Sequence, residues 1–317
     1  METIKDDVCL FNKIDDSFTI KDGVLIEYHD SDDRTEIVIP NGVTSIGEAA
    51  FSFCPFLRSI VIPNSVTSIG EGAFCDCHSL RSIVIPNGVT SIAGDAFSGC
   101  KSLSSVSVDK DNKVYDSRND CNAIIETKTN KLVCGCKNTV IPNGVTSIGE
   151  EAFCDCYSLR SIVIPNGVTS IEEGAFRGCF DLASIVIPNS VTSIAGDAFF
   201  YCKSLSSVAV DKDNKVYDSR NDCNAIIETK TNKLVCGCKN TVIPNDVTSI
   251  GEGAFYGCDG LRSIVIPNSV TSIGNNAFRC CFSLKIYCEV SSKPDGWDDK
   301  WNPSNRPVVW GYKSDNK

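Results

Sequence analysis

The amino-acid sequence predicts a β-rich α/β fold, a single right-handed solenoid of about eleven coils with a cap at each end. The first observation behind this prediction is the tripeptide Ile-Pro-Asn, which occurs eight times in steps of 23 residues, apart from two steps of 56 residues. The second is that the apolar residues keep one register from all eight prolines. A short fixed period is typical of stacked units that bury their apolar faces against each other, with one continuous core. The prolines are Pro40, Pro63, Pro86, Pro142, Pro165, Pro188, Pro244 and Pro267.

Each repeat begins with a short strand that ends at the proline. In the third repeat, residues 82–85 (Ser-Ile-Val-Ile) place two isoleucines on one face, which is the alternation of a half-buried strand. The following Pro-Asn-Gly at 86–88 favours a turn, because proline presets the first turn position and asparagine or glycine tolerates the next. A second, shorter extended piece is expected at 89–92. The segment 94–100 then suits a single helical or 3₁₀ turn.

A phenylalanine and a cysteine recur at fixed positions in every repeat. Burial of each phenylalanine stabilises the fold by about 1.5–3 kcal/mol. Because free cysteine behaves as a small hydrophobic residue, we interpret the repeated cysteines as a buried ladder of thiols. The phenylalanines are Phe51, Phe74, Phe97, Phe153, Phe176, Phe199, Phe255 and Phe278, and the cysteines are Cys54, Cys77, Cys100, Cys156, Cys179, Cys202, Cys258 and Cys281.

The repeat pattern LxxIxIPxxVTxIxxxAFxxC, present from about residue 40 to residue 286, resembles the BspA-type leucine-rich repeats. Residues 18–25 are similar to the N-terminal segment of that family, and residues 287–312 are similar to its closing segment. The resemblance implies a leucine-rich-repeat solenoid with an N-terminal cap at 1–34, repeats at 35–286 and a C-terminal cap at 287–317. It also implies a microbial surface or secreted protein, typically an adhesin that contacts host matrix proteins or other cells.

All three tryptophans, Trp297, Trp301 and Trp310, lie in the closing segment. We expect them to cover the apolar end of the last coil, since an open solenoid end would expose its core. The alternative is that they stack on a sugar ring.

Two longer repeats, at about 109–139 and 211–241, account for the 56-residue steps. They belong to a tandem duplication of 102 residues. In the first of them, residues 123–134 are expected to form a β-hairpin. Glu126 would pair with Lys131 across this hairpin, which is a favourable cross-strand charge pair.

The same hairpin register predicts two disulfides. It places Cys121 opposite Cys136 and, in the second copy, Cys223 opposite Cys238. The alternative is that each pair consists of neighbouring reduced thiols.

The residues needed for metal or catalytic chemistry are incomplete, so we expect no metal, no cofactor and no enzymatic activity. The loop from Asp109 to Asp120 weakly resembles a calcium loop, but Lys113 takes a ligand position and neither the turn glycine nor the closing glutamate is present. Paired cysteines with CxC spacing lack the CxxC spacing and converging partner pair of most zinc sites. The two histidines, His29 and His78, lie near no nucleophile motif.

Charge and hydropathy restrict the partners. A formal net charge of -10 and a pI of about 4.8 disfavour nucleic acid and anionic lipid as ligands. No stretch approaches the ~20 apolar residues of a membrane-spanning helix. The first ten residues, METIKDDVCL, have neither the cationic nor the apolar region of a secretory signal. If the native protein is exported, its signal is absent from this sequence or its route is unconventional.

The strands leave one candidate protein-binding surface, which we name the valine–arginine stripe and expect on the concave side of the solenoid. If the isoleucines of each strand point inward, these residues face solvent. Exposed valines beside arginines favour a contact surface, and on an acidic protein the stripe would be a local cationic site. The alternative is that valine is present because it stabilises strands. The stripe consists of Arg58, Val61, Arg81, Val84, Arg160, Val163, Val186, Arg262 and Val265.

The sequence therefore predicts a non-enzymatic protein-binding module whose partner is a protein of unknown identity, by family resemblance a host matrix or cell-surface protein. The resemblance places it at the cell surface or outside the cell. The odd total of 19 cysteines and the missing signal peptide leave a second hypothesis, an intracellular leucine-rich-repeat scaffold in the cytoplasm. The redox state of the thiols and cell fractionation would discriminate the two.

Overall fold

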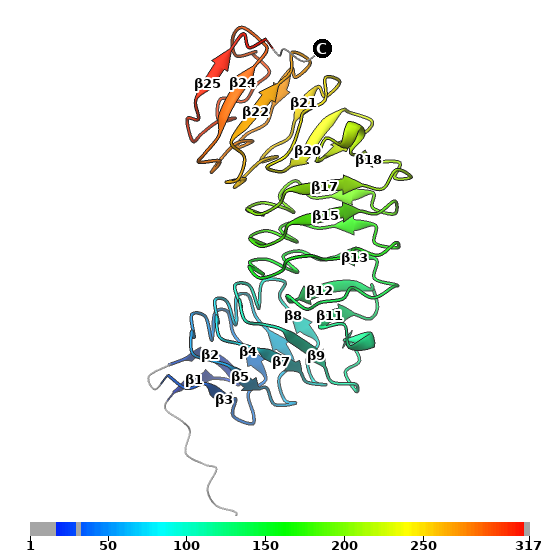
Figure 1. Ribbon diagram of the computed structural model, residues 1–317. Coiled ribbons are helices and arrows are strands. Elements are labelled where there is room, and N and C mark those ends of the chain that lie inside the picture. Colours follow the sequence, from blue (N-terminus) through cyan, green and yellow to red (C-terminus); the bar gives the residue numbers. More distant parts are fainter. Residues whose placement is uncertain (1–16, 30–32, 314–317) are drawn as a thin grey trace, which may run out of the picture.

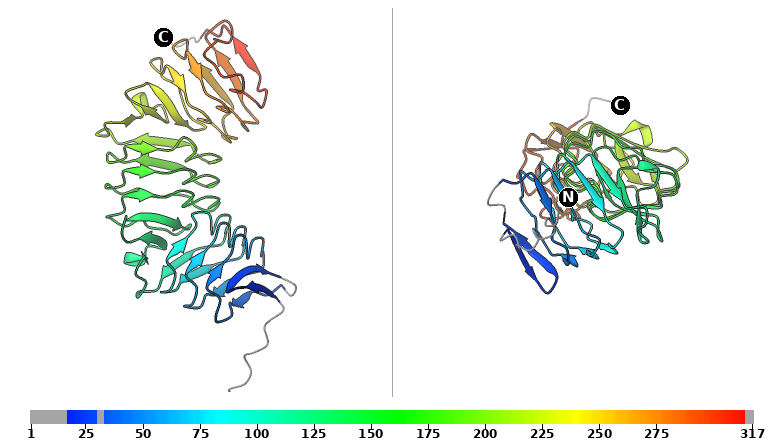
Figure 2. Two further views of the ribbon diagram at one scale, coloured as in Figure 1. Left: turned by 180° about the vertical axis from the view of Figure 1, so that it is seen from behind. Right: turned by 90° about the horizontal axis from the view of Figure 1, so that it is seen from below.

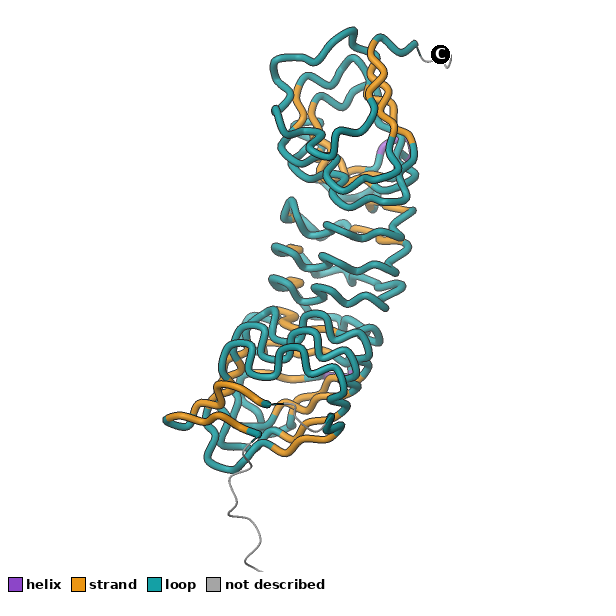
Figure 3. Tube along the Cα trace, turned by 90° about the vertical axis from the view of Figure 1, so that its left-hand side faces the viewer, coloured by secondary structure: helices purple, strands orange, loops and turns teal. Residues whose placement is uncertain are grey.

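The computed structural model describes residues 17–29 and 33–313, and within them no helix is long and apolar enough to span a membrane. The chain winds into a β-rich solenoid of about twelve turns, close to the predicted number (Figure 1). Strands and loops make up almost all of the stack (Figure 3). Of the N-terminal cap predicted at 1–34, residues 1–16 and 30–32 lie outside the described residues, as do residues 314–317 of the C-terminal cap.

In five of the eight proline-containing coils a strand precedes the proline; we call these strands, and those in register with them, the proline-side strands, and they pair in parallel with their neighbours. The strands predicted before Pro142, Pro165 and Pro244 are not formed. The pairing keeps the register of the repeats, so that Ile37 lies beside Ile60 and Ile83 lies beside Val106. These strands form four small sheets, β3-β5, β7-β9, β15-β17 and β22-β24-β25. Their bounds are β3 Glu36–Val38, β5 Ser59–Val61, β7 Ser82–Ile85, β9 Ser105–Val108, β15 Ser184–Ile187, β17 Ser207–Val210, β22 Ser263–Ile266, β24 Lys285–Cys288 and β25 Val308–Trp310.

A second set of two-residue strands follows the proline turns, as the sequence predicts. Each consists of Ser-Ile, and successive isoleucines such as Ile46 and Ile69 lie side by side in the buried core. Their bounds are β4 Ser45–Ile46, β6 Ser68–Ile69, β8 Ser91–Ile92, β13 Ser147–Ile148, β14 Ser170–Ile171, β16 Ser193–Ile194, β21 Ser249–Ile250 and β23 Ser272–Ile273.

The segment expected to form a helical or 3₁₀ turn forms a run of separate turns instead, so that prediction was wrong. In residues 93–100 every second amide bonds three residues back, for example Ser98 N to Asp95 O at 2.9 Å. The carbonyls of the alternate residues accept hydrogen bonds from amides of the preceding coil; Ser98 O, for example, accepts from Asp76 N at 2.9 Å. A helix cannot form because neighbouring coils take alternate backbone groups. We call these pieces the turn segments.

The two longer repeats contain the predicted β-hairpins and carry the described helical residues, which form two short 3₁₀ pieces. Glu126 lies opposite Lys131, as predicted. The second hairpin strand then joins the stack, because Leu132 pairs in parallel with Ile148 of the next coil. The bounds are β10 Tyr115–Asp116, β11 Ala123–Glu126 and β12 Lys131–Gly135 in the first repeat, and β18 Tyr217–Asp218, β19 Ala225–Glu228 and β20 Lys233–Gly237 in the second, with 3₁₀ pieces Arg118–Asp120 and Arg220–Asp222.

In each longer repeat a buried asparagine takes the place of the buried valine that follows the proline turn in the other coils: Asn112 N donates to Asp109 O at 3.0 Å, as Val89 N does to Pro86 O at 3.3 Å. The Asn112 side chain donates to Pro86 O at 2.8 Å and to Val89 O at 3.0 Å. Its Oδ1 accepts the amides of Val114 and Tyr115 at 2.8 and 2.9 Å. Asn214 makes the same four contacts in the second copy. All hydrogen-bonding groups of the amide are therefore satisfied, which is why a polar side chain can be buried here.

The core divides into three clusters, whereas the sequence suggested one continuous core. The hairpin separates the first two clusters and faces both, since Ile124 belongs to the first and Ile125 to the second. The phenylalanine ladder breaks at the same places, because the longer repeats lack the turn segment that carries this residue. Three stacks result: Tyr28–Phe51–Phe74–Phe97, Phe153–Phe176–Phe199 and Phe255–Phe278–Trp301.

The solenoid bends at each longer repeat, after β9 and again after β17 (Figures 1 and 2). A longer repeat adds a hairpin at one edge of the stack and omits the turn segment at the other. The turn segments of the flanking coils therefore meet directly, as shown by Ser98 Oγ and Cys154 O at 3.5 Å and by the Phe200 and Tyr256 rings stacked at 4.7 Å. The inner side of each bend is thus formed by turn segments.

Both ends of the described core are covered. At the N-terminal end, β1 Phe18–Lys21 and β2 Val24–Tyr28 form an antiparallel hairpin whose second strand pairs with β4. At the C-terminal end, the buried Trp297 and Trp301 pack edge to face at 4.9 Å, and Trp301 meets the last phenylalanine, Phe278. Two of the three tryptophans therefore serve the end of the core and are not available for a ligand.

Candidate protein-binding surface

Four of the five valines of the stripe occupy outward positions of the proline-side strands, and Val163 has the equivalent position in a segment that forms no strand. The isoleucines on either side of each valine are buried, and Val61, Val84 and Val186 are more than half exposed. Val163 is the most open, at 81% exposure. Val265 is only partly exposed to solvent because Tyr287 of the next strand lies beside it. The β-alternation predicted for these strands therefore holds along the stack.

The same register contains three exposed valines that the sequence prediction omitted. Val38, Val140 and Val242 each stand two residues before a proline and are between 68 and 71% exposed. Their position relative to the proline was visible in the sequence. Lys137 and Lys239 stand five residues before their prolines, which is the arginine position of the other coils. Spacing from the proline would have found all five.

The arginines form a column beside the valines because their backbones are hydrogen-bonded from coil to coil. Arg81 N donates to Arg58 O at 3.0 Å, and Lys285 N donates to Arg262 O at 2.9 Å. All four arginine side chains are exposed. None of them makes an ion pair with another described residue, in contrast to Arg118, Arg177 and Arg220 elsewhere in the chain. The side chains of this column therefore carry positive charges that no described carboxylate neutralises in an ion pair.

The stripe does not lie where we expected on the curved molecule. We predicted a concave stripe, but the turn segments form the inner side of each bend, and the strands that carry the stripe, such as β15 and β22, lie on the face beside it (Figure 1). The reason is that the bend comes from the missing turn segments of the longer repeats, a feature that has no counterpart in the ordinary 23-residue period.

The inner sides of the two bends differ in chemistry despite the duplication. In the first bend, burial and nearby carboxylates raise the pKa of Glu151 and of Asp155, and Arg177 lies 3.4 Å from Glu151. In the second bend, Tyr201 and Tyr256 pack edge to face at 4.8 Å. No group of His, Cys, Asp or Glu in the described residues has an arrangement that could hold a metal ion.

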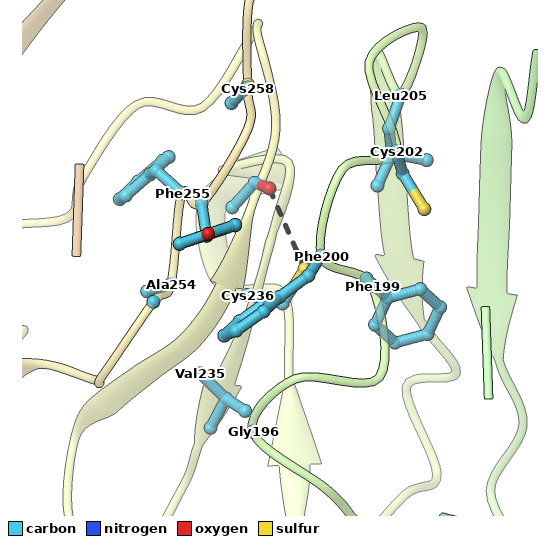
Figure 4. Close-up of a pocket in the computed structure, with 13 residues that line it drawn as sticks. Gly196, Phe199, Phe200, Cys202, Leu205, Val235, Cys236, Ala254, Phe255 and Cys258 are labelled. Atoms are coloured by element: carbon cyan, nitrogen blue, oxygen red, sulfur yellow. Dashed lines mark hydrogen bonds between the residues drawn. The ribbon is translucent and has the colours of Figure 1, made fainter. Parts of the chain in front are cut away.

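A pocket lies at each bend. The pocket of the second bend has an empty volume of about 310 Å³, which includes open solvent, and it lies between the turn segments of Phe199 and Phe255 (Figure 4). The Phe200 ring and the Cys236 thiol project toward it. Its lining is mostly apolar side chains, three cysteines and Tyr256, and it has no charged side chain of the kind that a small-molecule site often uses to orient its ligand.

The cysteines of the repeats form the predicted buried ladder. Five of them, Cys77, Cys100, Cys179, Cys202 and Cys281, donate to a phenylalanine carbonyl of the preceding coil, for example Cys77 Sγ to Phe51 O at 3.0 Å. Cys156, which follows a longer repeat, is only partly buried. Burial raises the pKa of the Cys202 thiol to about 12, so this thiol stays protonated and weakly nucleophilic at neutral pH.

The register that suggested the two disulfides is not the register of the structure. A bulge between Ile124 and Ile125 shifts the pairing by one residue, so that Ile124 lies opposite Cys134. Cys121 is consequently no longer opposite Cys136, and neither this pair nor Cys223 and Cys238 form a disulfide. The Cys121 thiol donates to Ala123 O at 3.7 Å and the Cys136 thiol to Asn122 O at 3.5 Å.

Neither histidine has the surroundings of a catalytic base. His29 is half exposed and hydrogen-bonds Thr19 Oγ1 at 2.9 Å, while His78 Nδ1 lies 3.1 Å from Gly99 O. Neither contact is with an activated nucleophile, which a hydrolase triad would need.

The stacked parallel strands, the buried isoleucine, phenylalanine and cysteine positions and the terminal caps define a leucine-rich-repeat solenoid. The chain belongs to the BspA-type leucine-rich-repeat family: the family model described as "BspA type Leucine rich repeat region" matches residues 27–123, 124–232 and 225–293. Proteins of this family are typically protein-interaction modules, generally without enzymatic activity, and are often found at the surface of bacteria.

Two solved structures share the fold over nearly the whole chain. One is a leucine-rich cell surface protein from Faecalibacterium prausnitzii, 24% identical, with 95% of each chain covered and a TM-score of 0.50. The other is a leucine-rich repeat protein from Eubacterium ventriosum, 21% identical, covering 92% of this chain and 89% of that chain with a TM-score of 0.52. No curated protein matches the chain.

Proposed function

We propose that this protein is a non-enzymatic adhesin-like module that binds another protein through the valine–arginine stripe. The observation that carries the proposal is the row of exposed valines beside arginines that have no ionic partner among the described residues. Exposed apolar area of this kind is removed from water when a partner covers it. Arginine is enriched at protein interfaces because its planar fork matches carboxylates and its stem covers apolar surface.

The partner in this proposal is a host matrix or cell-surface protein, and the module acts at the cell surface or after secretion. Membership of the BspA-type family supports this location, and the relative from Faecalibacterium prausnitzii is described as a cell surface protein. The second candidate is an intracellular scaffold, which the many unbonded thiols of the structure favour, since reduced cysteines are typical of the cytosol.

Surface labelling of intact native cells separates the two candidates. A membrane-impermeant amine reagent is applied, the protein is recovered, and its lysines are examined by mass spectrometry. Labelling of exposed lysines such as Lys110 and Lys128 is expected for a surface protein. Unlabelled protein in the soluble cytosolic fraction, recovered from cells whose known surface proteins are labelled, would refute the adhesin.

Binding itself is tested with the purified chain against immobilised matrix and cell-surface proteins. A double variant, Val163→Thr with Arg160→Ser, removes apolar area and one charge from the centre of the stripe. We expect a loss of affinity of about tenfold or more, equivalent to about 1.4 kcal/mol. The matched control is Thr169→Ser on another face of the same coil. Equal loss in the control, or none in the double variant, would exclude the stripe as the contact.

The two disulfides remain a prediction tied to an oxidising location. Exported protein is expected to carry Cys121–Cys136 and Cys223–Cys238 after a small adjustment of the bulged hairpins. Non-reducing peptide mass spectrometry of protein taken from its native compartment measures this. Four free thiols after mild oxidation would exclude both bonds.

A further inference from the structure

The valine–arginine stripe, together with the valines and lysines found in its register, is divided into three patches of similar composition. At the end of the first and second blocks the valine position holds a small residue, Ser107 in β9 and Ala209 in β17. The arginine position holds a serine in both strands, Ser104 and Ser206. The hairpins follow directly, so that no exposed valine continues the column across a bend.

Each patch combines outward-facing valines, of which Val265 alone is only partly exposed, with two cationic side chains at the arginine position. Lys285, exposed in β24, follows patch 3 beside Arg262. The valines of patches 1 and 2 are equivalent in the 102-residue duplication, and so are Arg58 and Arg160, whereas Arg81 corresponds to Ala183 and Lys137 to Thr35. Patch 1 consists of Val38, Val61, Val84, Arg58 and Arg81; patch 2 of Val140, Val163, Val186, Lys137 and Arg160; and patch 3 of Val242, Val265, Lys239 and Arg262.

The cations of a patch repel each other in the free protein. The hydrogen bond from Arg81 N to Arg58 O places these two residues one strand spacing apart, about 4.8 Å. Like charges side by side on a sheet are destabilising. Glu36 in β3 is the one carboxylate on the strands of patch 1, and the corresponding segments 137–141, 160–164, 184–187, 239–243 and 262–266 contain none. Carboxylates supplied by a ligand would remove this repulsion.

A second copy of this chain does not fit the patches. Face-to-face packing of two patches would bring cation against cation, while the rest of the protein carries the excess of negative charge, with a formal net charge of -10. An acidic partner is attracted to the patches and repelled by the surrounding surface, which confines it to the stripe.

We propose that each patch takes one extended acidic segment of a partner protein, with carboxylates against the cations and apolar side chains against the valines, and that the three patches bind a partner with repeated segments together. This inference rests on the proposed protein-binding function. The patches are separated by about five strand spacings, or about 24 Å along the stack. A flexible linker of about 20 residues spans that distance. Linked segments of matched length gain about 10²–10⁴-fold in affinity over one segment.

The test uses two synthetic peptides as probes and the full chain as receptor. One peptide is a single eight-residue segment that alternates glutamate and valine. The other contains three such segments joined by Gly-Ser linkers of about 20 residues. Fluorescence anisotropy at low and high salt measures both dissociation constants. We expect the three-segment peptide to bind at least about 100-fold more tightly, with both affinities falling as salt rises.

Patch variants locate the binding. Serine replaces the cations of one patch at a time, as Arg58→Ser with Arg81→Ser, Lys137→Ser with Arg160→Ser, or Lys239→Ser with Arg262→Ser. Serine already stands at this position in two coils, so the fold accepts it, and an unchanged melting temperature confirms folding. Each pair should weaken the three-segment peptide by about tenfold or more, and all three pairs together should abolish its binding.

Several outcomes would overturn the inference. Equal affinity for the two peptides would exclude joint binding, and loss of all binding from one patch variant alone would exclude equivalent patches. A peptide with lysine in place of glutamate that binds equally well would exclude the acidic partner. If no acidic peptide binds but a matrix or cell-surface protein does, the inference fails while the proposed function stands. If that protein also binds the variant in which all three cation pairs are replaced, the stripe is excluded as its binding surface.

Discussion

Replacement of Asn112 by alanine tests how the longer repeats are held in the stack. The side chain is 8% exposed and makes four hydrogen bonds, two to the carbonyls of the preceding coil and two from the amides that start its own hairpin. Each bond contributes a net ~0.5–1.5 kcal/mol, so Asn112→Ala should lower the free energy of unfolding by about 4 kcal/mol. The loss is large because the amides of Val114 and Tyr115 and the carbonyl of Val89 lose this partner, although Pro86 O keeps its hydrogen bond from Val89 N at 3.3 Å.

Urea unfolding followed by circular dichroism measures this loss, and amide hydrogen exchange locates it. The amides of Val114 and Tyr115 donate to Asn112 Oδ1, so they should exchange faster in the variant. The matched variant Asn214→Ala should lose about as much, because the second copy has the same contacts. Lys113→Ala, in the same loop and exposed, should stay within about 0.5 kcal/mol of the parent protein. An Asn112→Ala protein as stable as Lys113→Ala would refute the reasoning.

Two further predictions concern close packing and ionisation. A Cβ at Gly135 would overlap the ring of Phe153, so Gly135→Ala should lower the free energy of unfolding, measured in urea, by about 2 kcal/mol or more. Gly196 has open space where a Cβ would stand, so Gly196→Ala should leave the stability almost unchanged. Equal effects of the two substitutions would contradict this packing. Burial raises the pKa of Cys75 and of Cys154 to about 11 from a value of 9.0 in the unfolded chain. The folded state then holds protons that the unfolded state has released, so stability is fully present below pH 9 and falls as pH rises toward 11. Thermal unfolding of reduced protein across this range checks the sign, and stability that rises with pH would contradict it.

The sequence predicted most of the individual coil because a coil is built from local patterns. Alternation in residues 82–85 placed Ile83 and Ile85 in the core, and the recurring cysteines proved to be a buried ladder. The pairing of Glu126 with Lys131 also followed from the hairpin pattern. These features depend on residues close together in the chain or on one fixed period.

The candidate site was predicted in part. The valines of the stripe are exposed because strand alternation decides which side of a sheet a residue faces. The division into three patches and the position of the stripe relative to the bends were not predicted, because both arise where coils of different length meet. The bulge at Ile124 likewise displaced Cys121 from Cys136, and a bulge cannot be read from alternation alone.

The sequence by itself determined the period, the strand and turn of each coil, the buried positions and the family to which the chain belongs. Only the tertiary structure decided where the backbone hydrogen bonds go and where the stack bends. The turn segments show the reason: Ser98 O accepts from Asp76 N of the preceding coil, so a segment with the local pattern of a helical turn cannot become one. The bends follow from the same kind of contact, since a hairpin that lacks a turn segment brings its flanking coils together at one edge.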